Sequence, residues 1–123
     1  MPIMQELTHH PTEIRLRKSA GVLAVVFDSG EKFELPFEYL RVFSPSAEVK
    51  GHGTEILQVG KELVKVVGVE PVGNYAVRLM FDDGHDTGLY SWPVLYDLGK
   101  NQQQNWDRYL RRLQDAGYQR KLP

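Results

Sequence analysis

One short acidic segment carries most of the residues in this sequence that could do chemistry. Asp82, Asp83, Gly84, His85 and Asp86 place three carboxylates and one imidazole within five consecutive residues. Carboxylates bind hard cations, and an imidazole that titrates near neutral pH can act as an acid–base group. The segment lacks the spacing of an EF-hand loop or a facial triad, and turns favour Asp and Gly for local reasons. We interpret it as a structural turn in which His85 is the functional candidate.

Two serines and a second histidine form another candidate region. His52 has a glycine on each side, which allows close approach of a ligand or marks a flexible bend. Ser44 and Ser46 flank a proline, but no G-x-S-x-G nucleophile elbow surrounds them. Their hydroxyls are expected to cap a loop or the start of a helix. The glycines beside His52 match neither a P-loop nor a dinucleotide-binding motif.

Trp92 is the third candidate, because it stands where a strand is expected to pass into a helix. A large aromatic side chain at such a junction generally closes one end of a core. An exposed Trp92 would instead be an anchor for a partner.

The C-terminal part of the chain is basic, with six cations against two aspartates from residue 100 onward. A solvated helix face is the ordinary explanation of such a charge excess. The aromatic residues there share the apolar face of the expected helix, so they are expected to lie in the core. The charged residues are Lys100, Asp107, Arg108, Arg111, Arg112, Asp115, Arg120 and Lys121.

The composition excludes several classes of protein. The chain has 123 residues and no cysteine, so it contains no disulfide, thiolate zinc site or cysteine-ligated iron–sulfur cluster. Fifteen Lys and Arg against 16 Asp and Glu give a net charge of -1, which argues against a dedicated nucleic-acid-binding protein. No apolar run reaches the roughly 20 residues that span a bilayer, and the N-terminus lacks the regions of a signal peptide. We expect a cytoplasmic domain with no nucleic-acid or membrane partner.

Hydrophobic alternation and turn residues predict an α+β fold. It comprises a mostly antiparallel sheet of about six strands from two hairpin units, a short helix and a C-terminal amphipathic helix. Pro93 suits the first turn of the short helix, and a single helical turn is expected over 37–43. The strands are expected at 13–17, 22–27, 33–37, 64–71, 75–81 and 86–90, and the C-terminal helix at 103–116.

The two hairpin units share a short sequence pattern. Phe27-Asp28-Ser29-Gly30 recurs as Phe81-Asp82-Asp83-Gly84, at an offset of 54 residues. Convergence of two hairpins on one turn chemistry is the simpler explanation, and duplication is the alternative. Residues 12–118 are expected to form one domain, with a flexible lead-in at 1–11 and a tail at 119–123.

Two segments together resemble a known family. Leu40-Arg41 with Ser44-Pro45-Ser46, followed by Asp83-Gly84-His85 and Ser91-Trp92, resembles the gamma-butyrobetaine hydroxylase-like N-terminal domain. The resemblance extends over roughly residues 11–118. In carnitine-pathway oxygenases this domain precedes a separate 2-oxoglutarate- and iron-dependent catalytic domain, for which this chain has no room.

The resemblance also implies a metal site that this chain has lost. Family members bind a structural zinc through a C-x-C-x-x-C segment and the histidine of D-G-H. By position, the cysteines correspond to Ser44, Ser46 and Val49, and the histidine to His85. Valine has no ligand atom and a neutral serine is a poor ligand, so no metal is expected. His85 is expected to hydrogen-bond with Ser44 or Ser46 instead.

The leading hypothesis is therefore a stand-alone bacterial accessory or interaction domain without enzymatic activity. Its contact surface would comprise the loop 44–53, the turn Asp82–Asp86 and Trp92. Similar domains fused to Mrp-type P-loop ATPases imply a protein partner in iron–sulfur or metal metabolism. One alternative is a metal-binding protein or enzyme component that holds zinc or iron through His85, His52 and nearby carboxylates. Another is a homodimerisation module.

Overall fold

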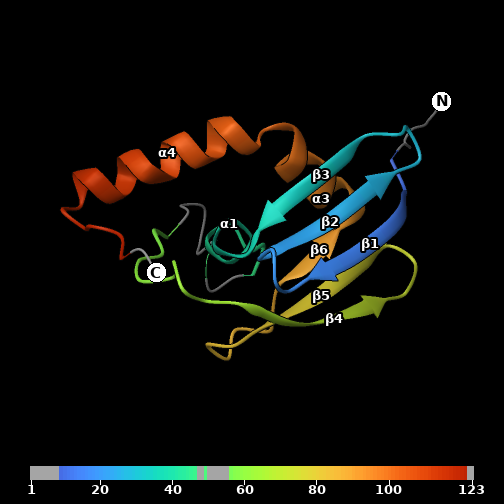
Figure 1. Cartoon of the computed structure of the whole chain (residues 1–123), viewed down its shortest axis with the longest axis horizontal. Coiled ribbons are helices and arrows are strands. Elements are labelled where there is room, and N and C mark those ends of the chain that lie inside the picture. Colours follow the sequence, from blue (N-terminus) through green and yellow to red (C-terminus); the bar gives the residue numbers. More distant parts are fainter. Residues whose placement is uncertain (1–8, 47–48, 50–55, 122–123) are drawn as a thin grey trace.

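Two three-stranded antiparallel sheets form the framework of the computed structural model, which describes residues 9–46, 49 and 56–121. The strand orders are β1-β2-β3 and β4-β5-β6, and a helix follows each sheet in the chain (Figure 1). The α+β prediction with two hairpin units is confirmed. The elements are β1 (Pro11–Arg17), β2 (Val22–Phe27), β3 (Lys32–Pro36), α1 (Phe37–Val42), β4 (Val66–Val72), β5 (Ala76–Phe81), β6 (Leu89–Ser91), α3 (Trp92–Lys100) and α4 (Gln102–Asp115).

The repeated sequence pattern forms the same turn in both sheets. Gly30 donates its N–H to the carbonyl of Phe27 at 2.9 Å, and Gly84 donates to Phe81 at 3.1 Å. The two glycines have φ values of 91° and 90°, a region that side chains rarely adopt. The second turn therefore fixes where the segment that contains His85 leaves β5.

The apolar faces of both sheets enclose one core together with α1. Leu23, Val25 and Phe27 alternate with half-buried neighbours along β2, and β5 contributes Leu79 and Phe81. This alternation follows from the two-residue period of side chains on a strand. All six residues of α1 are buried, although Glu38 and Arg41 are charged. The sequence pattern predicts only a single helical turn there, whereas the structure has a six-residue helix.

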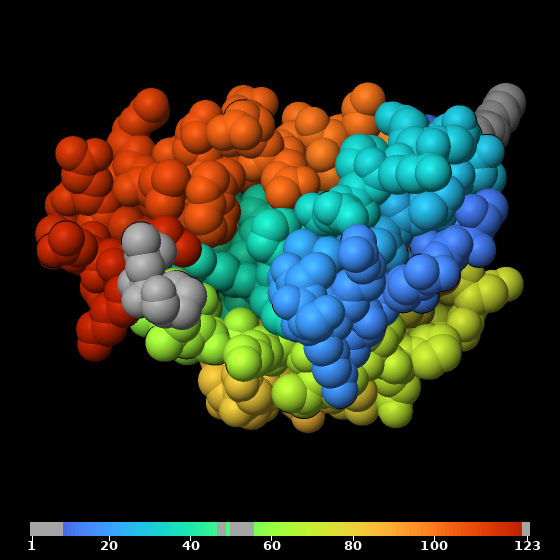
Figure 2. All heavy atoms as spheres, viewed as in Figure 1, coloured from blue at the N-terminus to red at the C-terminus, as the bar shows by residue number. Residues whose placement is uncertain are grey.

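Helix α4 covers α1 from the side opposite the second sheet. Its buried residues Tyr109 and Leu113 join the core, while its charged residues are mostly exposed. Residues of α3, α4 and the C-terminal segment, coloured orange to red, gather at the upper left and upper centre of the molecule (Figure 2). No helix in the described part of the chain combines the length and apolarity needed to cross a membrane.

Both ends of the described chain contact the folded body. The His9 ring stacks on Tyr96 with ring centroids 3.7 Å apart, and β1 begins at Pro11. Near the C-terminus, Arg120 donates two hydrogen bonds to the buried carboxylate of Glu38. Residues near both ends of the described chain are therefore held by contacts with its other elements.

The Glu38–Arg120 pair predicts a measurable stability effect. Tyr109 also donates to Glu38, at 2.7 Å, so removing the guanidinium leaves a buried carboxylate with fewer donors. We expect Arg120→Ala to lower the free energy of unfolding by about 1–3 kcal/mol in urea denaturation. Arg111→Ala, at an exposed position of α4, should change it by less than about 0.5 kcal/mol. Equal effects of the two variants would contradict a stabilising role of the C-terminal contact.

Candidate functional site

The candidate site forms where the segment after α1 meets the segment after β5. Ser44 Oγ lies 2.9 Å from His85 Nε2, and both side chains are buried. Ser44 is at the end of α1, and the turn described above delivers His85 from the other sheet. The predicted hydrogen bond between His85 and one of the two serines is thus confirmed, with Ser44 as the partner.

A pair of hydroxyl groups lies next to the Ser44–His85 pair. Ser46 Oγ lies 2.7 Å from Thr87 Oγ1, and the Ser46 N–H donates to Ser44 Oγ. Val49 donates its N–H to the Ser46 carbonyl at 3.0 Å and is almost completely buried. Of the positions implied by the family resemblance, Ser44 contacts His85 directly, Ser46 contacts Ser44, and Val49 is linked to Ser46 through the backbone.

Gly88 allows the two segments to approach each other closely. A Cβ at this position would lie 2.4 Å from Ser44 Oγ and 3.2 Å from a ring carbon of Tyr90. Real Cβ atoms do not reach such distances, so any side chain would push the segments apart. The backbone here stays outside a regular strand, and β6 begins at Leu89 rather than at the expected Asp86.

The Asp83 carboxylate accepts three hydrogen bonds at this site, two of them from cationic side chains. Its Oδ2 accepts from Arg41 Nε at 2.9 Å and from Lys61 Nζ at 3.2 Å, and its Oδ1 accepts from the His85 N–H at 3.1 Å. Burial alone would raise the pKa of Asp83, but these hydrogen bonds and the charge of Arg41 outweigh it and lower the pKa. Asp83 is therefore ionised and fully engaged at neutral pH.

The other two carboxylates of the acidic segment face other neighbours. Asp82 Oδ1 accepts the N–H of Lys65 at 3.0 Å, which ties the turn to the residues before β4. Asp86 is exposed and lies 3.7 Å from Arg78 in a weak ion pair. The three carboxylates do not converge on a common point, so the segment serves mainly as a turn.

Trp92 lies at the opposite end of the second sheet from His85. Its neighbour Ser91 pairs with Ala76 at the start of β5, whereas His85 bonds to Phe81 at the end of β5. The Trp92 indole N–H donates to the Asn74 carbonyl at 2.7 Å. Trp92 is therefore separate from the surface around His85. His52 lies outside the described residues.

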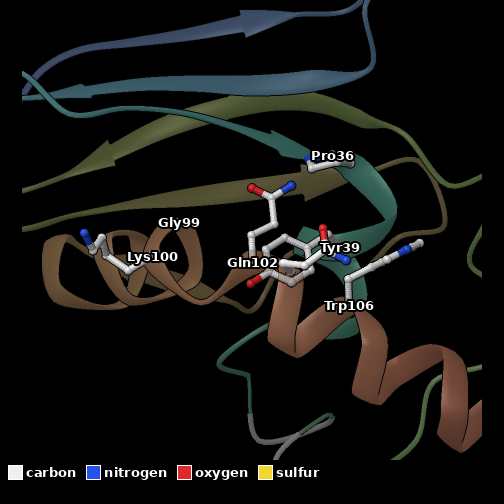
Figure 3. Close-up of a pocket in the computed structure, with 7 residues that line it drawn as sticks. Pro36, Tyr39, Gly99, Lys100, Gln102 and Trp106 are labelled. Atoms are coloured by element: carbon white, nitrogen blue, oxygen red, sulfur yellow. The ribbon is translucent and has the colours of Figure 1, made fainter.

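Two surface hollows are candidates for binding sites. One, of about 240 Å³, is lined by Arg41, Asp83, Gly84 and His85 and opens beside the buried pair. A larger hollow of about 420 Å³ lies at the corner where α3 passes into α4, beside Tyr39 and Trp106 (Figure 3). There the Tyr39 hydroxyl donates to the Leu98 carbonyl, and burial raises the pKa of Tyr39 to about 12. This second hollow is a packing corner with its phenol already paired.

The geometry does not favour nucleophilic catalysis. Ser44 and His85 have the spacing of a nucleophile and its base, but Ser44 has no exposed surface. The Ser44 hydroxyl also accepts from the Ser46 N–H, which holds it in place. The Ser44 side chain is therefore buried and held by neighbouring polar groups rather than presented at the surface.

Comparison with known proteins places the chain in a family. A family model described as "Gamma-butyrobetaine hydroxylase-like, N-terminal" matches residues 14–96. The chain belongs to this family. A search of curated proteins found no match.

Solved structures of similar chains support the assignment to the gamma-butyrobetaine hydroxylase-like N-terminal family. Two solution structures determined by NMR are 51% and 48% identical to this chain, each with a TM-score of 0.81. They cover 96% and 92% of this chain, and the match covers 89% and 90% of theirs. A crystal structure of a DUF971-family protein of unknown function from Acidithiobacillus ferrooxidans ATCC 23270 is 42% identical, with a TM-score of 0.62. That match covers 73% of this chain and 92% of the other.

The zinc site implied by the family resemblance does not fit the residues present. Val49 offers no ligand atom, and Ser44 and His85 are in direct hydrogen-bond contact. Among residues 9–46, 49 and 56–121, no three His, Asp or Glu side chains are grouped to hold a metal ion. The alternative of a site shared by His85 and His52 stays a prediction, because His52 is not described.

Sequence reasoning missed three residues of this site: Arg41, Lys61 and Thr87. Arg41 was part of the Leu40-Arg41 pattern, but nothing in local spacing connects it to Asp83, which is 42 positions away. Lys61 and Thr87 carry no sequence signal that separates them from other polar residues. Their roles depend on how the two sheets pack together.

Gly88→Ala tests whether the close contact of Gly88 with Ser44 and Tyr90 stabilises the fold. The new methyl group would collide with Ser44 Oγ and Tyr90, so we expect a loss of about 1–3 kcal/mol in the free energy of unfolding and shifted His85 ring resonances. Gly68→Ala is the matched control, because its Cβ would meet only the flexible Met80 side chain. If Gly88→Ala costs no more than Gly68→Ala, the two segments are not tightly joined.

Proposed function

We propose that this protein is a non-catalytic accessory domain that binds a protein partner through the surface around His85. This surface consists of the exposed parts of the turn Asp82–Asp86 with Lys61 and the rim of the 240 Å³ hollow. The observation that carries the proposal is the buried Ser44–His85 pair beneath an open, charged hollow. Such an arrangement supplies a rigid surface but no accessible nucleophile.

A partner in iron–sulfur or metal metabolism is the specific form of this proposal. It rests on the resemblance to domains that are fused to Mrp-type ATPases. Family membership alone does not assign an activity, so the proposal needs a binding experiment. The chain has no cysteine and would contribute to such a process by contact rather than by holding a cluster.

Affinity capture from the cells of origin, followed by binding measurements with the purified partner, tests the proposal. Asp86 is an exposed residue of the surface with only a weak ion pair, so Asp86→Arg reverses a charge without disturbing the core. We expect this variant to change the affinity at least about tenfold, equivalent to about 1.4 kcal/mol. Trp92→Ala, at the far end of the sheet, should have a smaller effect.

Asp115→Arg is the matched control, because Asp115 is an exposed aspartate at the end of α4. It should leave the affinity unchanged. Equal affinities of the Asp86→Arg and Asp115→Arg variants would overturn the proposed surface. Failure to recover any stoichiometric partner would overturn the proposed function.

A further inference from the structure

The hollow beside His85 contains hydrogen-bond donors that the protein does not use. Arg41 is only 6% exposed, yet its guanidinium carries five N–H groups. Its Nε donates to Asp83 and its Nη1 donates to Gln58 at 3.3 Å. Within the described part of the chain, no residue accepts a hydrogen bond from Nη2. Among the described residues, Glu62 Oε1 is the only side-chain N or O atom that is both completely buried and without a hydrogen bond. Arg41 Nη2 has no such bond and therefore keeps some contact with solvent.

Two cations and one carboxylate are in direct contact at the hollow. Arg41 and Lys61 both contact the single carboxylate of Asp83, whose two oxygens already accept three hydrogen bonds. Asp82 and Asp86 do not line the hollow. At the hollow itself, the two cations Arg41 and Lys61 therefore share one carboxylate, in a partly desolvated position where charges interact strongly.

The shape of the hollow suits a small planar anion. Gly84 forms one wall, and no heavy atom lies within 4 Å of where its Cβ would be. The volume of about 240 Å³ accommodates one carboxylate on a short side chain but not a large ligand. A guanidinium matches a carboxylate in geometry.

We infer that this hollow binds a carboxylate group of the partner, supplied by a Glu or Asp side chain, through Arg41 and Lys61. The inference rests on the proposed function, because it names the partner chemistry for the same surface. The Arg41 Nη2 group donates to the carboxylate, and Lys61 adds its charge at the rim. Gly84 lets the acidic side chain enter.

Two peptides that differ only in the charged group test this inference by NMR titration of the ¹⁵N-labelled protein. The probes are acetyl-Gly-Glu-Gly-amide and acetyl-Gly-Gln-Gly-amide at matched ionic strength, with inorganic phosphate as a third arm. We expect saturable shifts of the Gly84 and His85 amides and of the Arg41 Nε–H with the Glu peptide only. Equal shifts with both peptides, or shifts with phosphate alone, would overturn the inference.

Lys61→Gln and Lys65→Gln provide the matched pair of variants. Lys61 forms an ion pair with Asp83, a residue that lines the hollow, whereas Lys65 is an exposed lysine four residues away with no ion pair to the described lining residues. Lys61→Gln should weaken binding of the Glu peptide about two- to fivefold, the range for a partly exposed charge, and Lys65→Gln should not. Arg41→Lys keeps the charge but loses the planar donors, so it should weaken binding further. Equal affinities of the two glutamine variants would overturn the role of Lys61.

The titration does not depend on finding the partner, so it separates the two proposals. A partner affinity that changes in Asp86→Arg but not in Lys61→Gln would support the proposed function and overturn the carboxylate site. A carboxylate-specific titration in the absence of any partner would support the site and overturn the proposed function.

Discussion

The buried hydrogen bond between Ser44 and His85 joins the two halves of this fold. Ser44 follows the first sheet and α1, while His85 follows the turn of the second sheet. A hydrogen bond of this kind contributes about 0.5–1.5 kcal/mol to stability, so its loss would weaken the junction. The Ser46–Thr87 contact and the absence of a side chain at Gly88 hold the same two segments together.

The two charged residues of α1 interact with different parts of the fold. Glu38 is buried against α4 and the C-terminal segment, where Tyr109 and Arg120 donate to it. Arg41 faces the other way and pairs with Asp83 beside the hollow. A short, wholly buried helix can carry two charges because each has its own partner. Helix α1 thereby connects the packing of α4 with the surface around His85.

The strands and turns were largely predictable because alternation and glycine turns are local signals. The shared Phe-Asp-x-Gly pattern predicted two hairpins, and both adopt the same turn. The complete burial of helix α1 was not predicted, because charged residues such as Glu38 and Arg41 usually indicate an exposed segment. The distance of Trp92 from His85 and the Arg41–Asp83 pair depend on how the sheets pack, which single-sequence periodicity does not contain.

The central prediction is that hydrogen bonds at this junction, rather than a bound metal, stabilise the fold. The direct test compares the wild-type protein with the Ser44→Cys/Ser46→Cys/Val49→Cys variant, by thermal unfolding with added zinc or chelator and by elemental analysis of protein without a His-tag. We expect no chelator effect and no stoichiometric metal in the wild type. The variant should bind one zinc and unfold at a higher temperature with it, because three thiolates and His85 complete a tetrahedral set. Stoichiometric zinc in the wild type, with loss of stability on chelation, would contradict the claim.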